Sequence, residues 1–317
     1  MVESKSRLQS IQSLQPGSLW QLIQNRTIHA LDCGALQPLT TNCELIEQNG
    51  IQFVAQVIPN LARRDASKLQ DTPKKNASNF NPFLPYEPDL FVADISETHL
   101  CLLNKFNVVD HHFLIVTRAF EDQEMPLTLE DFVAMWQCLT ELDGLAFYNS
   151  GKLAGGSQRH RHLQIIPLPF ASNHFALPIT SVISQAQFSN GIGIVPAFPF
   201  PHALIKLTAY WAESPIAAGK QTLSCYYQLL NAVNLVQPTG ELSAYNLLIT
   251  REWMLIIPRV QACFESISIN ALGFAGAILV GDETQLQHLK EHSPMAVLRA
   301  VSGSRLFHAK EGLGRGF

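Results

Sequence analysis

The residues best suited to chemistry lie in one segment, Asn149 to Pro167, which reads NSGKLAGGSQRHRHLQIIP. Its second part, His160–Pro167, has the character of a strand, and side chains at alternate positions of a strand share a face. We therefore expect His160, His162 and Gln164 to project together. Two imidazoles and an amide on one face are costly to bury without partners, so the group is interpreted as a functional face.

Such a face could bind a metal ion or carry out catalysis. A metal site would need a third ligand from elsewhere in the chain, and the candidates are His111, His112 and His174, although no spacing requires any of them. A plain structural alternative is a pair of core histidines that bond to neighbouring carbonyl groups. That alternative explains one histidine more easily than it explains the whole pattern, and we predict no metal site here.

The glycine-rich stretch before the histidines favours catalysis on a phosphate. Gly155 and Gly156 allow a tight turn and a close approach of the backbone. Backbone amides of this loop, together with Ser157 and Gln158, could form a cradle for an anion. A neutral histidine beside such a cradle is suited to attack phosphorus, and a covalent intermediate divides one difficult displacement into two easier ones.

The pattern N-x-G…G-x-S-Q-x-H-x-H-x-Q resembles the active-site segment of the histidine triad superfamily. It is most similar to the branch that contains galactose-1-phosphate uridylyltransferase and the diadenosine tetraphosphate phosphorylases (ATP adenylyltransferases). That branch has a glutamine where the hydrolases have a third histidine, and Gln164 fits it. Arg159 departs from the proline that often precedes the first histidine.

Further segments are similar to the phosphorylases and not to the uridylyltransferases, so that the resemblance extends from about residue 50 to 311. The zinc-binding cysteines of many uridylyltransferases have no counterpart here. The segments are NPFLPYEPDLFV at 81–92, LNKFNVVDHHFLIVT at 103–117, AYNLLITREWMLIIPR at 244–259 and NALGFAGAILV at 270–280.

The resemblance implies a role for each residue of the motif. His162 would attack the α-phosphorus, His160 would orient the site, and Gln164 would bind the nucleotidyl phosphate. Lys105 is added because it could reach a phosphate, although an ordinary lysine at a strand end is an equal alternative. The substrate-binding residues expected in this way are Asn149, Gly155, Gly156, Ser157, Gln158 and Lys105.

The resemblance also implies a reaction. His162 would take AMP from diadenosine tetraphosphate and expel ATP, and inorganic phosphate would then remove the AMP as ADP. No tightly bound cofactor is expected, and Mg²⁺ is expected only as a companion of the polyphosphate substrate. The alternatives are hydrolysis or transfer between ADP and sulfate on the same scaffold, and a nucleotide-binding regulator without turnover.

Runs of strands around single helices predict an α+β fold, a histidine-triad-like antiparallel sheet with flanking helices whose two halves share one extended sheet. A helix is expected to begin after Ser18, and another to run from Thr128 to Asp143-Gly144. Expected strands are 51–57, 99–104, 113–117, 145–149, 160–167, 203–207, 244–250 and 253–258. Further helices are expected at 221–235 and 283–291.

The domain organisation follows from a stretch without clear periodicity that contains PAFPFP. We expect a catalytic domain at 1–170, a linker at 171–201 and a C-terminal ATP adenylyltransferase-type domain at 202–317. A polar stretch at 62–81 predicts a long surface loop. Its basic residues at 63–75 could close over a polyphosphate or simply be solvated.

Composition limits the class of protein. The net charge is -4, and a pI near 6.2 argues against a dedicated nucleic-acid binder. The six cysteines form no C-x-x-C pair and are expected to be free thiols in a reducing compartment. The N-terminus does not look like a signal peptide, and no apolar run reaches 18 residues. These features predict a soluble cytoplasmic protein without nucleic-acid or membrane partners. The resemblance implies that its partners are small nucleotides and inorganic phosphate. The oligomeric state is left open.

Overall fold

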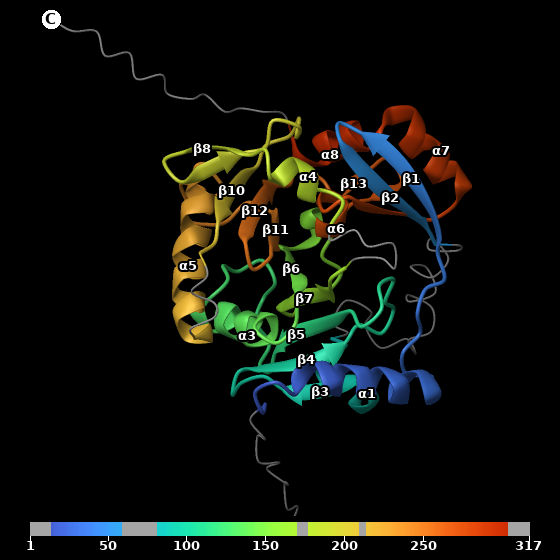
Figure 1. Ribbon diagram of the computed structural model, residues 1–317, viewed down its shortest axis with the longest axis vertical. Coiled ribbons are helices and arrows are strands. Elements are labelled where there is room, and N and C mark those ends of the chain that lie inside the picture. Colours follow the sequence, from blue (N-terminus) through green and yellow to red (C-terminus); the bar gives the residue numbers. More distant parts are fainter. Residues whose placement is uncertain (1–13, 59–80, 170–176, 209–213, 304–317) are drawn as a thin grey trace, which may run out of the picture.

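One antiparallel sheet of ten strands runs through both halves of the chain (Figure 1). The structure, a computed structural model, describes residues 14–58, 81–169, 177–208 and 214–303. The basic segment 62–75 and His174 lie outside these residues. In order across the sheet, the strands are β3 (Phe91–Asp94), β4 (His99–Leu103), β5 (Phe113–Thr117), β7 (His162–Pro167), β6 (Gly144–Asn149), β11 (Tyr245–Ile249), β12 (Trp253–Pro258), β10 (Ala203–Lys206), β9 (Ile192–Ile194) and β8 (Gln187–Ser189).

The two halves of the chain meet where β6 pairs with β11, and the register there places Asn149 opposite Asn246. The predicted α+β class and the shared sheet are therefore confirmed. The predicted linker also contributes to this sheet, because β8 and β9 lie within 187–194. The domain boundaries at 170 and 201 stay a prediction.

Two layers cover the sheet (Figure 1). One face packs on helices α1 (Leu19–Asp32), α3 (Leu129–Leu139) and α5 (Pro215–Ala232). The other face carries a second sheet and the remaining helices. These are β1 (Asn42–Gln48), β2 (Ile51–Val57), β15 (Ala277–Val280), the hairpin β13 (Cys263–Phe264) and β14 (Ile267–Ser268), α4 (Thr180–Ile183), α6 (Ala271–Phe274), α7 (Glu283–His292) and α8 (Pro294–Ser302). Strand β15 was not predicted, and it pairs in parallel with β2.

Helix α3 begins where its sequence predicts. Thr128 and Asp131 form a capping box, in which each side chain accepts from the other residue's backbone amide. The helix ends at Leu139 rather than at Asp143-Gly144, so the predicted end is late. Gly144 instead begins β6, where a Cβ would lie 3.0 Å from the Ile166 carbonyl oxygen.

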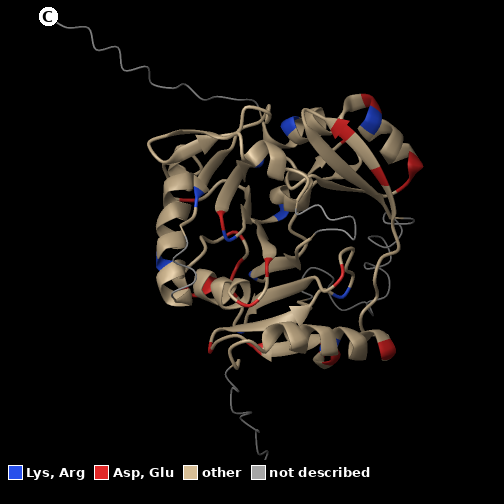
Figure 2. Ribbon diagram, viewed as in Figure 1, with Lys and Arg blue, Asp and Glu red and all other residues tan. Residues whose placement is uncertain are grey.

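Charged residues of both signs are distributed over several helices and strands (Figure 2). Lysine and arginine therefore do not gather on one element of the described part. None of the helices in that part is long and apolar enough to span a bilayer.

Candidate active site

Strand β7 places His162 and Gln164 on the face of the sheet opposite α3. Leu163 and Ile165 point into the core beneath the helices, as the alternation predicts. The other face has two separate apolar clusters. Gln164 lies between them, since its partners in the sheet are Leu114 of one cluster and Phe147 of the other. The polar pair therefore occupies a gap between two apolar clusters.

His162 is buried, and its ring is held in one tautomer. Its Nδ1 lies 2.8 Å from the His160 carbonyl oxygen, which can only accept, so Nδ1 carries the proton. Nε2 is then left with its lone pair. Burial lowers the pKa of His162 to about 4 and outweighs the hydrogen bond to the His160 carbonyl group, which acts to raise it. The ring is therefore neutral at physiological pH and carries a nucleophilic nitrogen.

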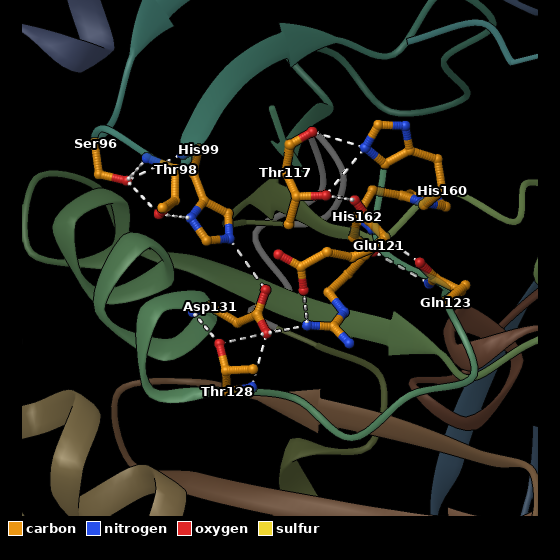
Figure 3. Close-up of polar contacts among 11 residues, drawn as sticks. Ser96, Thr98, His99, Thr117, Glu121, Gln123, Thr128, Asp131, His160 and His162 are labelled. Atoms are coloured by element: carbon orange, nitrogen blue, oxygen red, sulfur yellow. Dashed lines mark hydrogen bonds and ion pairs between the residues drawn. The ribbon is translucent and has the colours of Figure 1, made fainter. Parts of the chain in front are cut away.

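His160 lies just before β7, where the chain forms a single bridge to Asp122. The predicted strand is thus two residues too long at this end. Its ring still lies on the side of His162, because both rings contact Phe83, at centroid distances of 5.5 and 5.4 Å. Nε2 donates to the carbonyl oxygen of Thr117 at 2.7 Å (Figure 3). Nδ1 accepts from the Asn81 amide at 2.9 Å.

Gln164 is oriented by a chain of two hydrogen bonds. The Asn104 amide donates to Nδ1 of His112 at 3.0 Å, so His112 carries its proton on Nε2. That nitrogen donates to Oε1 of Gln164 at 3.1 Å. Burial lowers the pKa of His112 to about 4, which keeps this ring neutral. With Oε1 engaged, the amide group of Gln164 is left to donate.

The ring nitrogens of His112, His160 and His162 differ in whether they have a hydrogen-bond partner. Both nitrogens of His112 and both of His160 are hydrogen-bonded, as is Nδ1 of His162. Among the described residues, Nε2 of His162 has no hydrogen-bond partner. No third ligand in that part of the chain converges on these rings, since His111 bonds instead to Thr27 of α1. His174 lies outside the described residues, so the absence of a metal site here stays a prediction.

Gln123 fixes the backbone of His162 and was missed in the sequence. Its side chain is buried, accepts from the His162 amide at 2.8 Å, and donates to the His162 carbonyl oxygen at 3.2 Å. The side-chain amide of Gln123 also donates to the Asn149 carbonyl oxygen at 2.9 Å. The β6–β7 register ends at Phe147–Gln164. Beyond that pair, the Gln123 side chain supplies the hydrogen bonds to His162 and Asn149 that strand pairing no longer provides.

Asn149 is held by the second half of the chain. Its Oδ1 accepts from the Asn246 amide at 2.8 Å and from the Ala271 backbone at 2.9 Å. Arg259, which is buried, donates to Oδ1 of Asn246 at 2.5 Å and to the Ala154 carbonyl oxygen at 3.2 Å. Burial lowers the pKa of Arg259 to about 10. The C-terminal half therefore anchors the loop that precedes the histidines.

The two glycines of that loop are required by packing within the protein. Gly155 has a positive φ of 82°, and a Cβ there would lie 2.7 Å from the Ile269 carbonyl oxygen. A Cβ on Gly156 would lie 2.8 Å from the Gly151 carbonyl oxygen. The glycines let the loop fold tightly against β14 and α6, and their predicted contact with phosphate stays a prediction.

The remaining predicted substrate-binding residues differ in whether their side chains already bond to another residue. Ser157 is exposed and Gln158 is half-buried, and neither side chain bonds to any other described residue. Lys105 instead forms an ion pair with Glu87 at 2.7 Å. A contact between Lys105 and a phosphate would require this pair to open, so its role stays a prediction.

A buried charge network lies on the other side of β7. Arg161 bridges Glu121 at 2.5 Å and Asp131 at 3.2 Å, and Asp131 also accepts from Nε2 of His99 at 3.0 Å (Figure 3). Burial would raise the pKa of Asp131, but the His99 hydrogen bond and the Arg161 charge outweigh it and hold the pKa below its usual value. This network joins the N-terminus of α3 to the strand that carries His162.

Comparison with known proteins agrees with this geometry. Residues 9–185 match the family model of the Ap4A phosphorylase N-terminal domain, and 196–304 match that of the ATP adenylyltransferase C-terminal domain. The chain is 29% identical over 311 residues to diadenosine 5',5'''-P1,P4-tetraphosphate phosphorylase 2 of Saccharomyces cerevisiae, covering 86% of this chain and 90% of that protein.

Solved structures of the yeast Ap4A phosphorylase Apa2 share the fold. The complex with AMP has a TM-score of 0.75 at 25% identity and covers 95% of this chain and 100% of the other. The complex with Ap4A has a TM-score of 0.74 at 25% identity, with coverage of 92% and 98%. The chain therefore belongs to the Ap4A phosphorylase family of nucleotidyltransferases.

Proposed function

We propose that this chain phosphorolyses diadenosine tetraphosphate to ATP and ADP, reversibly, through an AMP–His162 intermediate. The observation that carries the proposal is the single ring nitrogen at the site, Nε2 of His162, that has no partner among the described residues. Family membership and the yeast relatives solved with Ap4A and with AMP support the choice of substrate.

In the first step, Nε2 of His162 attacks the α-phosphorus and the bond from that phosphorus to the polyphosphate oxygen breaks, so that ATP leaves. The hydrogen bond from Nδ1 to the His160 carbonyl oxygen stabilises the positive charge that the ring gains. The amide of Gln164, whose oxygen is held by His112, is placed to donate to the phosphoryl oxygens. Gln123 acts as a positioning residue, because it holds the backbone of His162.

In the second step, inorganic phosphate attacks the same phosphorus, the P–N bond breaks, and ADP leaves. Water would need a base to take its proton, whereas phosphate arrives with an anionic oxygen. Neither His112 nor His160 offers a free basic nitrogen, since both nitrogens of each ring are hydrogen-bonded. Gln164 carries an amide, which is not a base. This arrangement favours phosphate as the acceptor.

Other parts of the proposal rest on the sequence alone. Mg²⁺ would accompany the polyphosphate rather than reside in the protein. Ser157 and Gln158 would hold the leaving polyphosphate and then the incoming phosphate. The basic segment 62–75 would attract the polyphosphate through its charge. We propose a cytoplasmic location on the same basis.

The test is incubation with diadenosine tetraphosphate with and without inorganic phosphate, followed by separation of products. With phosphate, ATP and ADP should form in equal amounts and AMP should be scarce. Without it, ATP release should stop near one equivalent per chain. A third sample with sulfate in place of phosphate tests the sulfate alternative.

Two controls make the result specific. The His162→Ala variant should form neither product, whereas His288→Ala, at a half-buried histidine of α7, should behave as the parent does. The proposal is wrong if ATP and AMP accumulate at the same rate whether or not phosphate is present.

A further inference from the structure

Three side chains of different chemistry meet at the C-terminal end of α1. His29 lies in the last turn of the helix, Cys33 is its C-cap, and Asp89 lies in the short 3₁₀ helix η1 (Pro88–Leu90). One ligand atom from each of the three lies within 4.8 Å of the others. All three are exposed, and among the described residues this is the one group of its kind.

We propose that His29, Cys33 and Asp89 bind a zinc ion. Imidazole nitrogen, thiolate sulfur and carboxylate oxygen are the ligand types that zinc uses in proteins. Around a tetrahedral zinc ion, such atoms lie about 3–4 Å apart, given metal–ligand bonds of about 2.0–2.3 Å. The largest separation in the cluster, at most 4.8 Å, needs to close by about 1 Å, and the His29 and Asp89 atoms, which lie 2.8 Å apart, need to separate slightly. A water would then take the fourth position.

The local structure brings these ligands together for definable reasons. Residues four apart on a helix lie on the same face, so His29 and Cys33 point in the same direction. The C-terminal end of a helix carries a partial negative charge that attracts a cation. A thiolate and a carboxylate supply the two negative charges that balance a divalent ion. Arg26, which lines the same surface hollow as His29, is a positive charge that the site must tolerate.

A simpler description accounts for part of this cluster. Nε2 of His29 lies 2.8 Å from Oδ1 of Asp89, which is the geometry of a surface ion pair. An ion pair of this kind does not require a thiol. The Cys33 thiol has only a weak contact of 3.7 Å with the Ala30 carbonyl oxygen. A zinc site uses all three side chains, whereas the ion pair leaves the thiol without a role. Loss of metal binding on removal of the thiol distinguishes the zinc site from the ion pair.

The site has a structural consequence. Strand β3, which follows η1 directly, is the edge of the ten-stranded sheet, and α1 packs against both. A bound ion would link α1 to this edge and would close the long stretch of chain between Cys33 and Asp89. Metal that binds the folded chain more tightly than the unfolded chain raises the stability of the fold.

The test uses the full chain, freed of metal with a chelator and then titrated with Co²⁺ as a spectroscopic substitute for zinc. Absorption from cobalt–thiolate charge transfer should saturate at one ion per chain, and added Zn²⁺ should remove it. The matched control is Cys43→Ser, at another exposed cysteine, which should behave as the parent does. Cys33→Ser should abolish the band.

Two further variants and a second readout complete the test. His29→Ala and Asp89→Asn should each weaken binding at least about tenfold. Zn²⁺ should raise the melting temperature of the parent and of Cys43→Ser but not of Cys33→Ser. The proposal is overturned if the charge-transfer band is absent from the parent, or if it survives in Cys33→Ser. A melting temperature that responds to Zn²⁺ equally in the parent and in Cys33→Ser would also overturn it.

Discussion

The two faces of residues 160–165 differ in how they handle charge. On the side of the proposed reaction, His160 and His162 have their pKa values lowered, chiefly by burial. On the opposite side, Arg161 lies buried between the carboxylates of Glu121 and Asp131. One short stretch of strand therefore carries neutral rings on one face and a compensated ion network on the other.

The difference shows how the protein separates reactivity from rigidity. A nucleophile must be neutral and have a free lone pair. Burial keeps His162 neutral, and the bond from its Nδ1 to the His160 carbonyl oxygen leaves Nε2 free. A buried ion network stabilises only while every charge keeps its partner, which suits a part that fixes β7 against α3. Variants on each face, and the pH dependence of rate and stability, test this contrast.

The largest effect is expected on the reactive face. His162→Ala should lower turnover by at least about 10⁴-fold, because covalent catalysis has no substitute group. Binding of AMP, measured by calorimetry, should stay within a few-fold of the parent. If this variant keeps more than a tenth of parental turnover, the assignment of the nucleophile is wrong.

On the opposite face, the expected effect of a substitution is a loss of folding stability. Arg161→Met leaves the buried carboxylate of Asp131 without its main charge partner and should cost about 3–5 kcal/mol of the free energy of unfolding, measured with denaturant. Arg159→Met is the matched control, since Arg159 is 80% exposed, and it should leave that free energy nearly unchanged. Equal losses in the two variants would contradict the contrast between the faces.

Gln123 is expected to position His162, because its side chain bonds to both backbone polar groups of that residue. Gln123→Ala should lower the rate constant of adenylylation about 10–100-fold, as expected when a supporting contact of a reacting group is lost. AMP affinity should stay nearly unchanged. Gln287→Ala, at an exposed helix position, is the control. A loss of AMP affinity equal to the loss of rate would show that Gln123 has a general structural role instead.

The smallest effect concerns pH. His162 reacts when neutral, and its pKa of about 4 means that it stays neutral down to about pH 5. The burst of ATP without added phosphate should therefore keep its rate between pH 7 and 5 and fall below that. This half-reaction avoids the titration of phosphate itself. A fall centred near 6.5, the ordinary histidine value, would contradict the assigned environment.

Stability should follow a related pH dependence with a definite sign. In the unfolded chain, His112 and His162 titrate near 6.5, whereas in the folded chain both titrate near 4. Between these values the unfolded state binds more protons, so the free energy of unfolding falls as the pH is lowered. Circular dichroism at each pH should accompany the rate measurement, so that loss of fold is not mistaken for protonation of His162.

Local patterns explain which elements the sequence predicts. Thr128 and Asp131 form the capping box that begins α3, and the alternation of His162, Leu163 and Gln164 gives the two faces of β7 correctly. The unpredicted β15 is too short for a periodic signal, and it depends on pairing with β2, which lies far away in the chain. Hydrogen bonding across such distances is invisible to local reasoning.

The same limit applies to the site. The motif identifies His160, His162 and Gln164, but it does not show which ring nitrogen of His162 is free. That depends on the His160 carbonyl group and on Gln123, a glutamine in a polar stretch without any pattern. His112 was considered only as a possible metal ligand, whereas in the structure it orients Gln164. The free nitrogen of His162 and the orientation of Gln164 both depend on contacts that form only in the folded protein.

The central claim is that His162 carries AMP between two acceptors, and its most direct test is to isolate that species. Protein mixed with labelled diadenosine tetraphosphate in the absence of phosphate should be quenched, digested and mapped. The label should lie on the peptide that contains His162, should be labile in acid and stable in alkali, and should leave as ADP when phosphate is added to the unquenched protein. Rapid-quench samples that show product formation with no label on His162, or label on another residue, would contradict the account.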